Sequence, residues 1–223
     1  MLAQVKSGFS AGSVSRGPPA PTFVGSSTVN NSADISMPGG IASTDLAVLI
    51  DWGLDSDPTP PADTLPFGWT RIGTTQTDSG GSLLNGSRLN VCYKVLDGTE
   101  TTITGMATGG VWGARKVLLV FRKAASLTWG SPADVEAEVN NDGGTTKTIT
   151  VGAAPLIVIG YVGISSGTDL PMSPAETATV SVSSNGSLNV GYIIYGSSPA
   201  NNTIDPASVG NAYVIGGFYI PLT

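Results

Sequence analysis

Short runs of Val, Ile, Thr, Tyr and Phe recur along the chain from residue 21 onward, separated by Gly, Pro, Asn and Asp. Runs of this length, rich in β-branched and aromatic residues and bounded by turn-forming residues, are typical of β-strands. The pattern predicts strands at residues 22–25, 46–52, 69–72, 89–96, 100–104, 116–122, 146–151, 156–162, 178–183, 188–195 and 213–220.

The runs differ in how completely apolar they are. Residues 117–121 and 156–159 are continuously apolar and too short for a typical helix, so they are predicted to be central strands that are covered on both faces. Residues 100–104, 146–151 and 177–182 are alternating or polar-rich, which indicates strands with one face in water. Residues 132–139 fit a short helix or a strand equally well.

Two turns carry a hairpin signal. Asp97-Gly98 lies between the strands predicted at residues 93–96 and 100–104, and Asn185-Gly186 lies between those at 178–183 and 188–195. Glycine accepts a positive φ, which tight hairpin turns require. Each turn therefore predicts that the two strands it joins pair with one another.

The strand pattern continues to the last residues without a long linker or a recognisable internal repeat. We predict an all-β fold: a single large antiparallel β-sandwich of jelly-roll type over residues 21–223. Residues 1–20 are Gly- and Ser-rich and end in Gly-Pro-Pro-Ala, which favours an extended N-terminal arm.

Composition narrows the function classes. Charged residues make up 12% of the chain, against about 25% in an average soluble domain, and the chain has one Cys and no His. The lack of His removes Ser–His and Cys–His nucleophile pairs and nearly all zinc sites. A structural or binding protein is therefore favoured over an enzyme, with no catalytic, cofactor-binding or metal-binding residue predicted and no cofactor.

Charge also bears on partners and compartment. The net charge of −6 disfavours nucleic acid as a partner. Arg115-Lys116 and Arg122-Lys123 bracket an apolar run and are expected to solvate the two ends of a strand. Cys92 has no disulfide partner and is expected to be buried and inert. We expect no secretory signal and no membrane span. We expect the chain to be synthesised in a reducing cytosol.

An acidic cluster is the strongest candidate for chemistry. Asp51, Asp55, Asp57 and Asp63 lie close together in sequence, and carboxylates can hold Ca²⁺ or act as a glycosidase pair. The spacing is not that of an EF-hand, however, and no apolar surroundings are apparent that would raise one pKa. We expect a solvated loop at the end of a strand, with cation binding left open.

Three other motifs are weaker. The residues 163–167 match G-x-S-x-G but lack the His and the following helix of a nucleophile elbow. The Gly-rich residues 105–115 lack the order of a phosphate-binding loop. Four Trp residues could stack on sugars, although packing in the core or at its rim is more common for Trp. These four are Trp52, Trp69, Trp112 and Trp129.

Four segments follow one another in a distinctive order: Asp45-Leu-Ala-Val-Leu-Ile50, Pro66-Phe-Gly-Trp-Thr-Arg-Ile72, Arg88-Leu-Asn-Val-Cys-Tyr-Lys-Val-Leu-Asp-Gly-Thr-Glu100 and Lys116-Val-Leu-Leu-Val-Phe-Arg122. Their succession resembles small β-sandwich virion proteins of tailed bacteriophages. In that family a D-L-x-V strand, a P-x-G-W-T turn, a Y-K-V-x-D-G-T-E hairpin and a V-F-R strand recur in this order. The resemblance covers residues 21–125 and transfers no catalytic residue.

The resemblance and the composition together imply a non-enzymatic structural component of a tailed-phage virion. We expect it at the tail end, as a fibre, adaptor or tip that docks through residues 1–20. A head decoration protein and a carbohydrate-binding receptor-recognition module, with Trp112 and Trp129 on a host glycan, stay open as alternatives. The expected partners are other virion proteins and further copies of the chain, after synthesis in the host cytoplasm.

Overall fold

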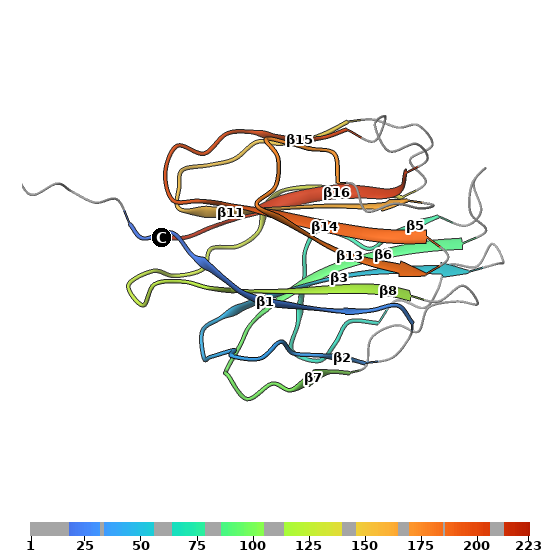
Figure 1. The fold of residues 1–223 in the computed structure, drawn as a ribbon, viewed down its shortest axis with the longest axis horizontal. Coiled ribbons are helices and arrows are strands. Elements are labelled where there is room, and N and C mark those ends of the chain that lie inside the picture. Colours follow the sequence, from blue (N-terminus) through green and yellow to red (C-terminus); the bar gives the residue numbers. More distant parts are fainter. Residues whose placement is uncertain are drawn as a thin grey trace, which may run out of the picture.

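A computed structural model describes residues 18–31, 34–55, 64–78, 86–104, 114–139, 146–164, 170–184, 186–205 and 212–223. Every regular element in this part of the chain is a strand, and every strand pairing is antiparallel. No helix long and apolar enough to cross a membrane occurs in these ranges. The structure confirms the predicted all-β sandwich, whose two main sheets pack face to face (Figure 1).

The first main sheet contains β1 (Thr22–Val29), β8 (Ala114–Arg122), β3 (Leu46–Asp55), β6 (Gly86–Val95) and β4 (Thr70–Arg71) in that order, and β5 (Gln76–Asp78) also pairs with β6. The second contains β13 (Ala178–Ser184), β14 (Gly186–Tyr195), β11 (Leu156–Ile164), β16 (Ala212–Pro221) and β9 (Ala133–Val139) in that order. Residues 22–122 thus build one sheet and residues 133–221 the other, a strand order that the sequence left open.

Two small sheets cover the outer faces of the large ones. The pair of β2 (Ile35–Ser36) and β7 (Thr102–Ile103) lies outside the first main sheet (Figure 1). The sheet of β10 (Lys147–Ile149), β15 (Asn202–Ile204) and β12 (Met172–Ser173) lies outside the second. The molecule therefore has four layers of β-structure.

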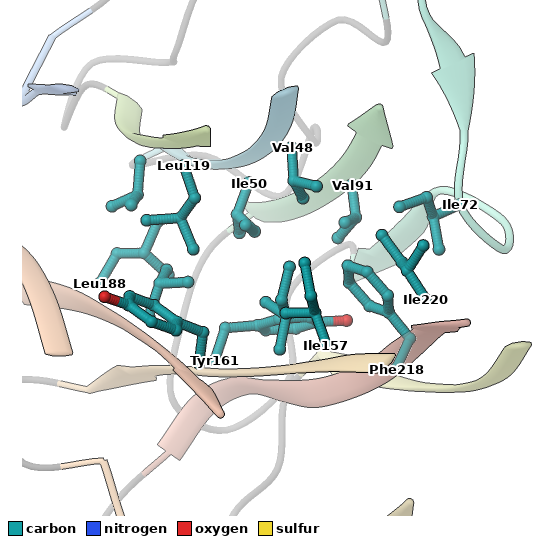
Figure 2. Packing of buried hydrophobic residues seen from close by; sticks show 14 of the residues in the cluster. Val48, Ile50, Ile72, Val91, Leu119, Ile157, Tyr161, Leu188, Phe218 and Ile220 are labelled. Carbon is teal, nitrogen blue, oxygen red and sulfur yellow. The ribbon is translucent and has the colours of Figure 1, made fainter. Parts of the chain in front are cut away.

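Alternation along the central strands divides their side chains between layers. In β8, Val117, Leu119 and Phe121 enter the core between the main sheets, whereas Leu118 and Val120 enter a separate cluster on the outer face. Figure 2 shows the central core, where Leu119 of the first sheet and Ile157 of the second both point into the space between the sheets. The prediction that residues 117–121 and 156–159 are covered on both faces is confirmed.

All eleven predicted strands overlap a strand of the structure, and residues 132–139 contain β9 rather than a helix. The turn at Asn185-Gly186 joins a true hairpin, because β13 pairs with β14 and Gly186 has a φ of 118°. Asn185 itself lies outside the described residues. The hairpin predicted at Asp97-Gly98 is wrong, since β7 pairs with β2 and not with β6. Gly98 does have a positive φ of 92°, but the apolar Ile103 enters the outer cluster, where β7 pairs with β2.

The two halves of the chain have the same topology, so the expectation of no internal repeat is corrected at the level of structure. Adding eight to each label turns the order β1-β8-β3-β6-β5 into β9-β16-β11-β14-β13, and the pair β2-β7 into β10-β15. The exception is the pair of short strands β4 and β12, which have different partners. One short sequence match accompanies this repeat: 89–93 reads Leu-Asn-Val-Cys-Tyr and 188–192 reads Leu-Asn-Val-Gly-Tyr.

A row of glycines explains how the three-stranded sheet fits against the second main sheet. Gly160 of β11 lies beside Gly191 of β14 and Gly217 of β16. A methyl group at Gly160 would lie 2.9 Å from side-chain atoms of both Ile204 and Met172. The glycines therefore leave room for apolar side chains of the small sheet, which explains a pattern that strand propensity alone disfavours.

Candidate functional site

The acidic residues singled out in the sequence do not form one site. Asp51 lies within β3 and is 2% exposed, so the expectation of a solvated loop is wrong for this residue. Asp55 is the last residue of β3, and Asp57 and Asp63 lie outside the described residues. Within the described ranges, no three His, Cys, Asp or Glu residues gather in a way that could hold a metal ion.

Asp51 belongs instead to a buried charge cluster on the outer face of the first main sheet. We define this cluster as Asp51, Arg88, Asn90 and Lys116, all at most 3% exposed. The register of β3 places Asp51 between Asn90 of β6 and Lys116 of β8. Arg88 donates from Nη2 to Asp51 Oδ2 over 2.8 Å, which compensates the buried carboxylate. Pairing of this kind is what permits a charge to be buried at all.

The cluster extends toward β4 through Arg71 and the neutral side chains of Asn90 and Thr75. Arg71 Nη1 donates to Asn90 Oδ1, and Thr75 Oγ1 donates to the same oxygen over 3.1 Å. Burial lowers the pKa of Lys116, and the nearby carboxylates of Asp51 and Asp34 only partly offset this effect. Asp51 therefore lies among cations, which is the opposite of the surroundings that a general acid with a raised pKa needs.

Arg115 and Lys116 were expected to solvate the end of a strand, and this expectation is wrong. Both are 0% exposed within β8. Arg115 lies with its guanidinium carbon 5.1 Å from the centre of the Trp52 ring, and its Nε donates to the Gly186 carbonyl over 3.2 Å. Burial lowers the pKa of Arg115 to about 10, still above neutral pH. At the other end of the run, Arg122 pairs with Asp45 over 2.7 Å, with its side chain 43% exposed.

Cys92 is buried, as expected, at 1% exposure. Burial and the neighbouring Asp51 carboxylate raise its pKa, which keeps the thiol protonated and unreactive. Gly163 of the G-x-S-x-G match lies within the buried strand β11 and opens no helix, while 165–167 lie outside the described residues. Residues 105–113 of the Gly-rich segment 105–115 also lie outside them.

Trp52 and Trp129 both pack within the fold and donate hydrogen bonds there. Trp52 is 0% exposed and its Nε1 donates to Ser87 Oγ over 3.0 Å. Trp129 packs against the central core and its Nε1 donates to the Thr44 carbonyl over 2.9 Å. Trp129 therefore contributes to the packing of the fold, and its contact with a glycan stays a prediction. Trp112 lies outside the described residues.

A pocket on the outer side of the first main sheet is the best candidate for a binding site. It has a volume of about 180 Å³ and is lined by Phe67, Trp69, Lys94, Glu100 and Thr102, among others. Phe67 and Trp69 come from one turn, in which the Trp69 amide donates to the Pro66 carbonyl over 3.1 Å and Gly68 has a φ of 78°. This turn holds the Trp69 side chain in the outer cluster and leaves Phe67 100% exposed.

The polar side of this pocket is an ion pair. Lys94 Nζ lies 2.8 Å from Glu100 Oε1. Burial raises the pKa of Glu100, but hydrogen bonds from Lys94 and from the backbone amides of Asp97 and Gly98 lower it more, so the pKa lies below its ordinary value. The pocket thus offers charged donors and acceptors with no net charge.

Pro66-Phe-Gly-Trp69 is one of the segments that carry the resemblance, and it was not predicted to be a site. The available signal was two aromatic residues on either side of a glycine in a predicted turn, where one ring can be buried and the other exposed. Comparison of this chain with protein-family models, with curated proteins and with solved structures finds no match.

Proposed function

We propose that this chain is a non-enzymatic structural component of a tailed-phage virion that assembles with further copies of itself. The resemblance of residues 21–125 to small β-sandwich virion proteins supports the virion role, and so does a sandwich that carries few charges. The observation that carries the proposal of assembly is the open edge of β13.

Natural sheets protect their edge strands with charges, prolines, bulges or short strands, because unpaired backbone groups recruit other strands. β9 carries Asp134, Glu136 and Glu138, and β1 has a register shift between Phe23 and Gly25. At the remaining edge, β4 and β5 have two and three residues. Each of these three edges thus has a recognised form of protection.

β13 has none of these features. Its seven residues, Ala-Thr-Val-Ser-Val-Ser-Ser, include no charge and no proline, and it pairs with β14 without a register shift. In the described residues no strand pairs with its other side. A second copy is the occupant we assign to this edge, since an uncharged strand can pair antiparallel with itself around a two-fold axis without bringing like charges together.

Pairing of this kind would place hydroxyl groups opposite hydroxyl groups. Val180 and Val182 contact the central core, so the alternating residues Thr179, Ser181 and Ser183 lie on the other face of the sheet. Cross-strand pairs of Thr and Ser stabilise antiparallel sheets. The second main sheet would then continue from one subunit into the next.

Cysteine cross-linking tests this proposal directly, because Cys92 is buried and the chain has no other cysteine. We expect Thr179→Cys, Ser181→Cys or Ser183→Cys to form a disulfide-linked dimer under oxidised glutathione. Thr148→Cys, an exposed strand position on β10, is the matched control and should stay monomeric. The native chain should form dimers in sedimentation experiments and the Ser181→Lys variant should not. In a dimer of the variant, the two introduced lysine side chains, both positively charged, would lie close together and repel one another.

A native chain that stays monomeric at all concentrations, with no dimer in any β13 cysteine variant, would contradict self-assembly. So would a dimer that Ser181→Lys leaves intact. Imaging phage particles that carry a labelled copy of the chain tests the virion role separately. Label at the tail end is the expected result; label on the head would favour the decoration alternative, and its absence from particles would reject both.

Attachment through the N-terminal arm is a further part of the proposal. The first described residues and the C-terminus lie at the same end of the sandwich (Figure 1), and Ala20 packs against Gly196 there. Deleting residues 1–17 leaves this contact in place. We expect the shortened chain to keep its melting temperature and to lose incorporation into particles. Normal occupancy of the shortened chain would show that the anchor lies elsewhere.

A further inference from the structure

The repeat provides an internal comparison for the pocket beside Phe67. In the first half of the chain, Leu65-Pro66-Phe67 lies between β3 and β6; in the second, Leu170-Pro171-Met172 lies between β11 and β14. Both leucines contact the outer apolar cluster of their half. Met172 is also buried in that cluster, at 7% exposure, whereas Phe67 is 100% exposed.

The reason lies in the main sheet beneath. By register, Gly160 and Gly191 correspond to Leu49 and Cys92, which pair with one another in β3 and β6. The glycines leave space into which Met172 and Leu170 pack. Leu49 and Cys92, both 1% exposed, fill that space in the first half. Trp69 enters the outer cluster of this half, and Phe67 is left fully exposed.

The polar wall of the pocket has no counterpart either. Lys94 pairs with Ala47, and Ile193 holds the equivalent position opposite Val158. Ile193 is apolar and 8% exposed, so the fold accepts a buried aliphatic side chain where the pocket has Lys94. The exposed ring of Phe67 and the ion pair of Lys94 with Glu100 therefore occur only in the first half among the described residues. The topology that the two halves share does not require them.

We propose that this pocket binds one neutral sugar ring of a glycan. The volume of about 180 Å³ slightly exceeds that of a cavity that holds benzene, roughly 150 Å³, and is well below the ~300 Å³ at which pockets for drug-sized ligands begin. A single ring with apolar and hydroxyl-bearing sides matches a lining that combines aromatic side chains with charged hydrogen-bond groups.

The charges of the pocket indicate which sugars it binds. Lys94 and Glu100 neutralise one another, so the pocket gains nothing from a phosphate or a cation. A neutral polyol can accept from the Lys94 ammonium and donate to the Glu100 carboxylate at the same time. The inference is independent of the virion role, because it concerns one site on an isolated subunit.

Ligand-observed NMR tests it with the methyl glycosides of glucose, galactose, mannose and N-acetylglucosamine, and with neutral oligosaccharides of these sugars. We expect saturation transfer from the native chain to at least one member of this panel. Phe67→Ala should weaken that binding roughly five- to tenfold through loss of stacking, and Phe67→Trp should retain it. Lys94→Met should also weaken it.

Val135→Ala is the matched control, because Val135 is a partly exposed apolar residue that does not line the pocket. It should bind like the native chain. The proposal is overturned if no sugar of the panel binds, if Phe67→Ala binds as well as the native chain, or if a proline-rich peptide occupies the pocket and the sugars do not. Release of new reducing ends from the oligosaccharides would show that the chain cleaves them, which would contradict the proposal of a site that binds sugars without cleaving them.

Discussion

Asp51 shows how neighbours determine the role of a residue. The side chain is 2% exposed, and its partner Arg88 is 0% exposed. Loss of one member of a buried ion pair typically costs about 3–5 kcal/mol, because it leaves the other charge without compensation. This pair is therefore more important for the folded state than any pair at the surface.

Arg88→Met should lower the free energy of unfolding by about 3–5 kcal/mol in urea titrations. Lys147→Met, which removes an ion pair with Glu138 whose carboxylate is 38% exposed, is the control and should cost less than about 1 kcal/mol. Equal losses of unfolding free energy in the two variants would show that the buried ion pair stabilises the fold no more than the exposed one.

The repeat also suggests how the buried charges can be replaced. Asp51, Arg88 and Lys116 correspond by register to Val162, Ser187 and Ile215 in the second half. The combined variant Asp51→Val, Arg88→Ser, Lys116→Ile should be more stable than Arg88→Met alone, since no unpaired charge is left behind. Urea titration of both variants measures the difference, and a combined variant that is the less stable of the two would contradict this interpretation.

Glu100 should make the free energy of unfolding depend on pH in the acidic range. Its pKa lies below its ordinary value in the folded protein, so the carboxylate stabilises the fold at pH values above about 4.3. This contribution is lost as the pH falls through the folded pKa. The difference in unfolding free energy between the native chain and Glu100→Gln should therefore be present at about pH 7 and shrink as the pH falls further below about 4.3. A difference that is unchanged by acid would mean that the Glu100 carboxylate does not stabilise the fold through its charge.

At the scale of elements, close approach of backbone explains the glycines within the long strands. Gly160→Ala brings a methyl group within 2.9 Å of Ile204 and Met172. Overpacking of this kind typically costs about 1–3 kcal/mol. Gly39→Ala, where the methyl group meets no atom within 4 Å, is the control and should change stability by less than about 1 kcal/mol. Thermal melts of both variants measure this, and a tolerated Gly160→Ala would show that the small outer sheet packs less tightly than described.

At the scale of the whole molecule, we expect no requirement for a divalent cation. Asp51 is compensated by Arg88, which removes one carboxylate from the acidic cluster considered as a calcium site. Melting temperatures in excess calcium and in excess chelator should therefore agree. A saturated tight site would add several kcal/mol through linkage and raise the melting temperature by several degrees, which would contradict this expectation.

The sequence by itself determined where most of the long strands lie and which of them are central, but it did not predict the short strands β2, β5, β12 and β15. Runs such as those in β8 and β11 are apolar at every position, and only a strand covered on both faces can bury such a run. Local chemistry was also sufficient at Gly186, where the turn joins neighbouring strands. These features depend on the period of the side chains and on backbone geometry, which neighbouring residues in the sequence establish.

Only the tertiary structure decided which strands pair and which polar groups are buried. Asp51, Lys116 and Arg88 are far apart in the sequence, and the register of three strands brings them together. The repeat stayed hidden because the two halves share a topology but few residues, so different side chains fill equivalent positions. The exposure of Phe67 was also decided by the tertiary structure, in which Trp69 of the same turn enters the outer cluster and Phe67 does not.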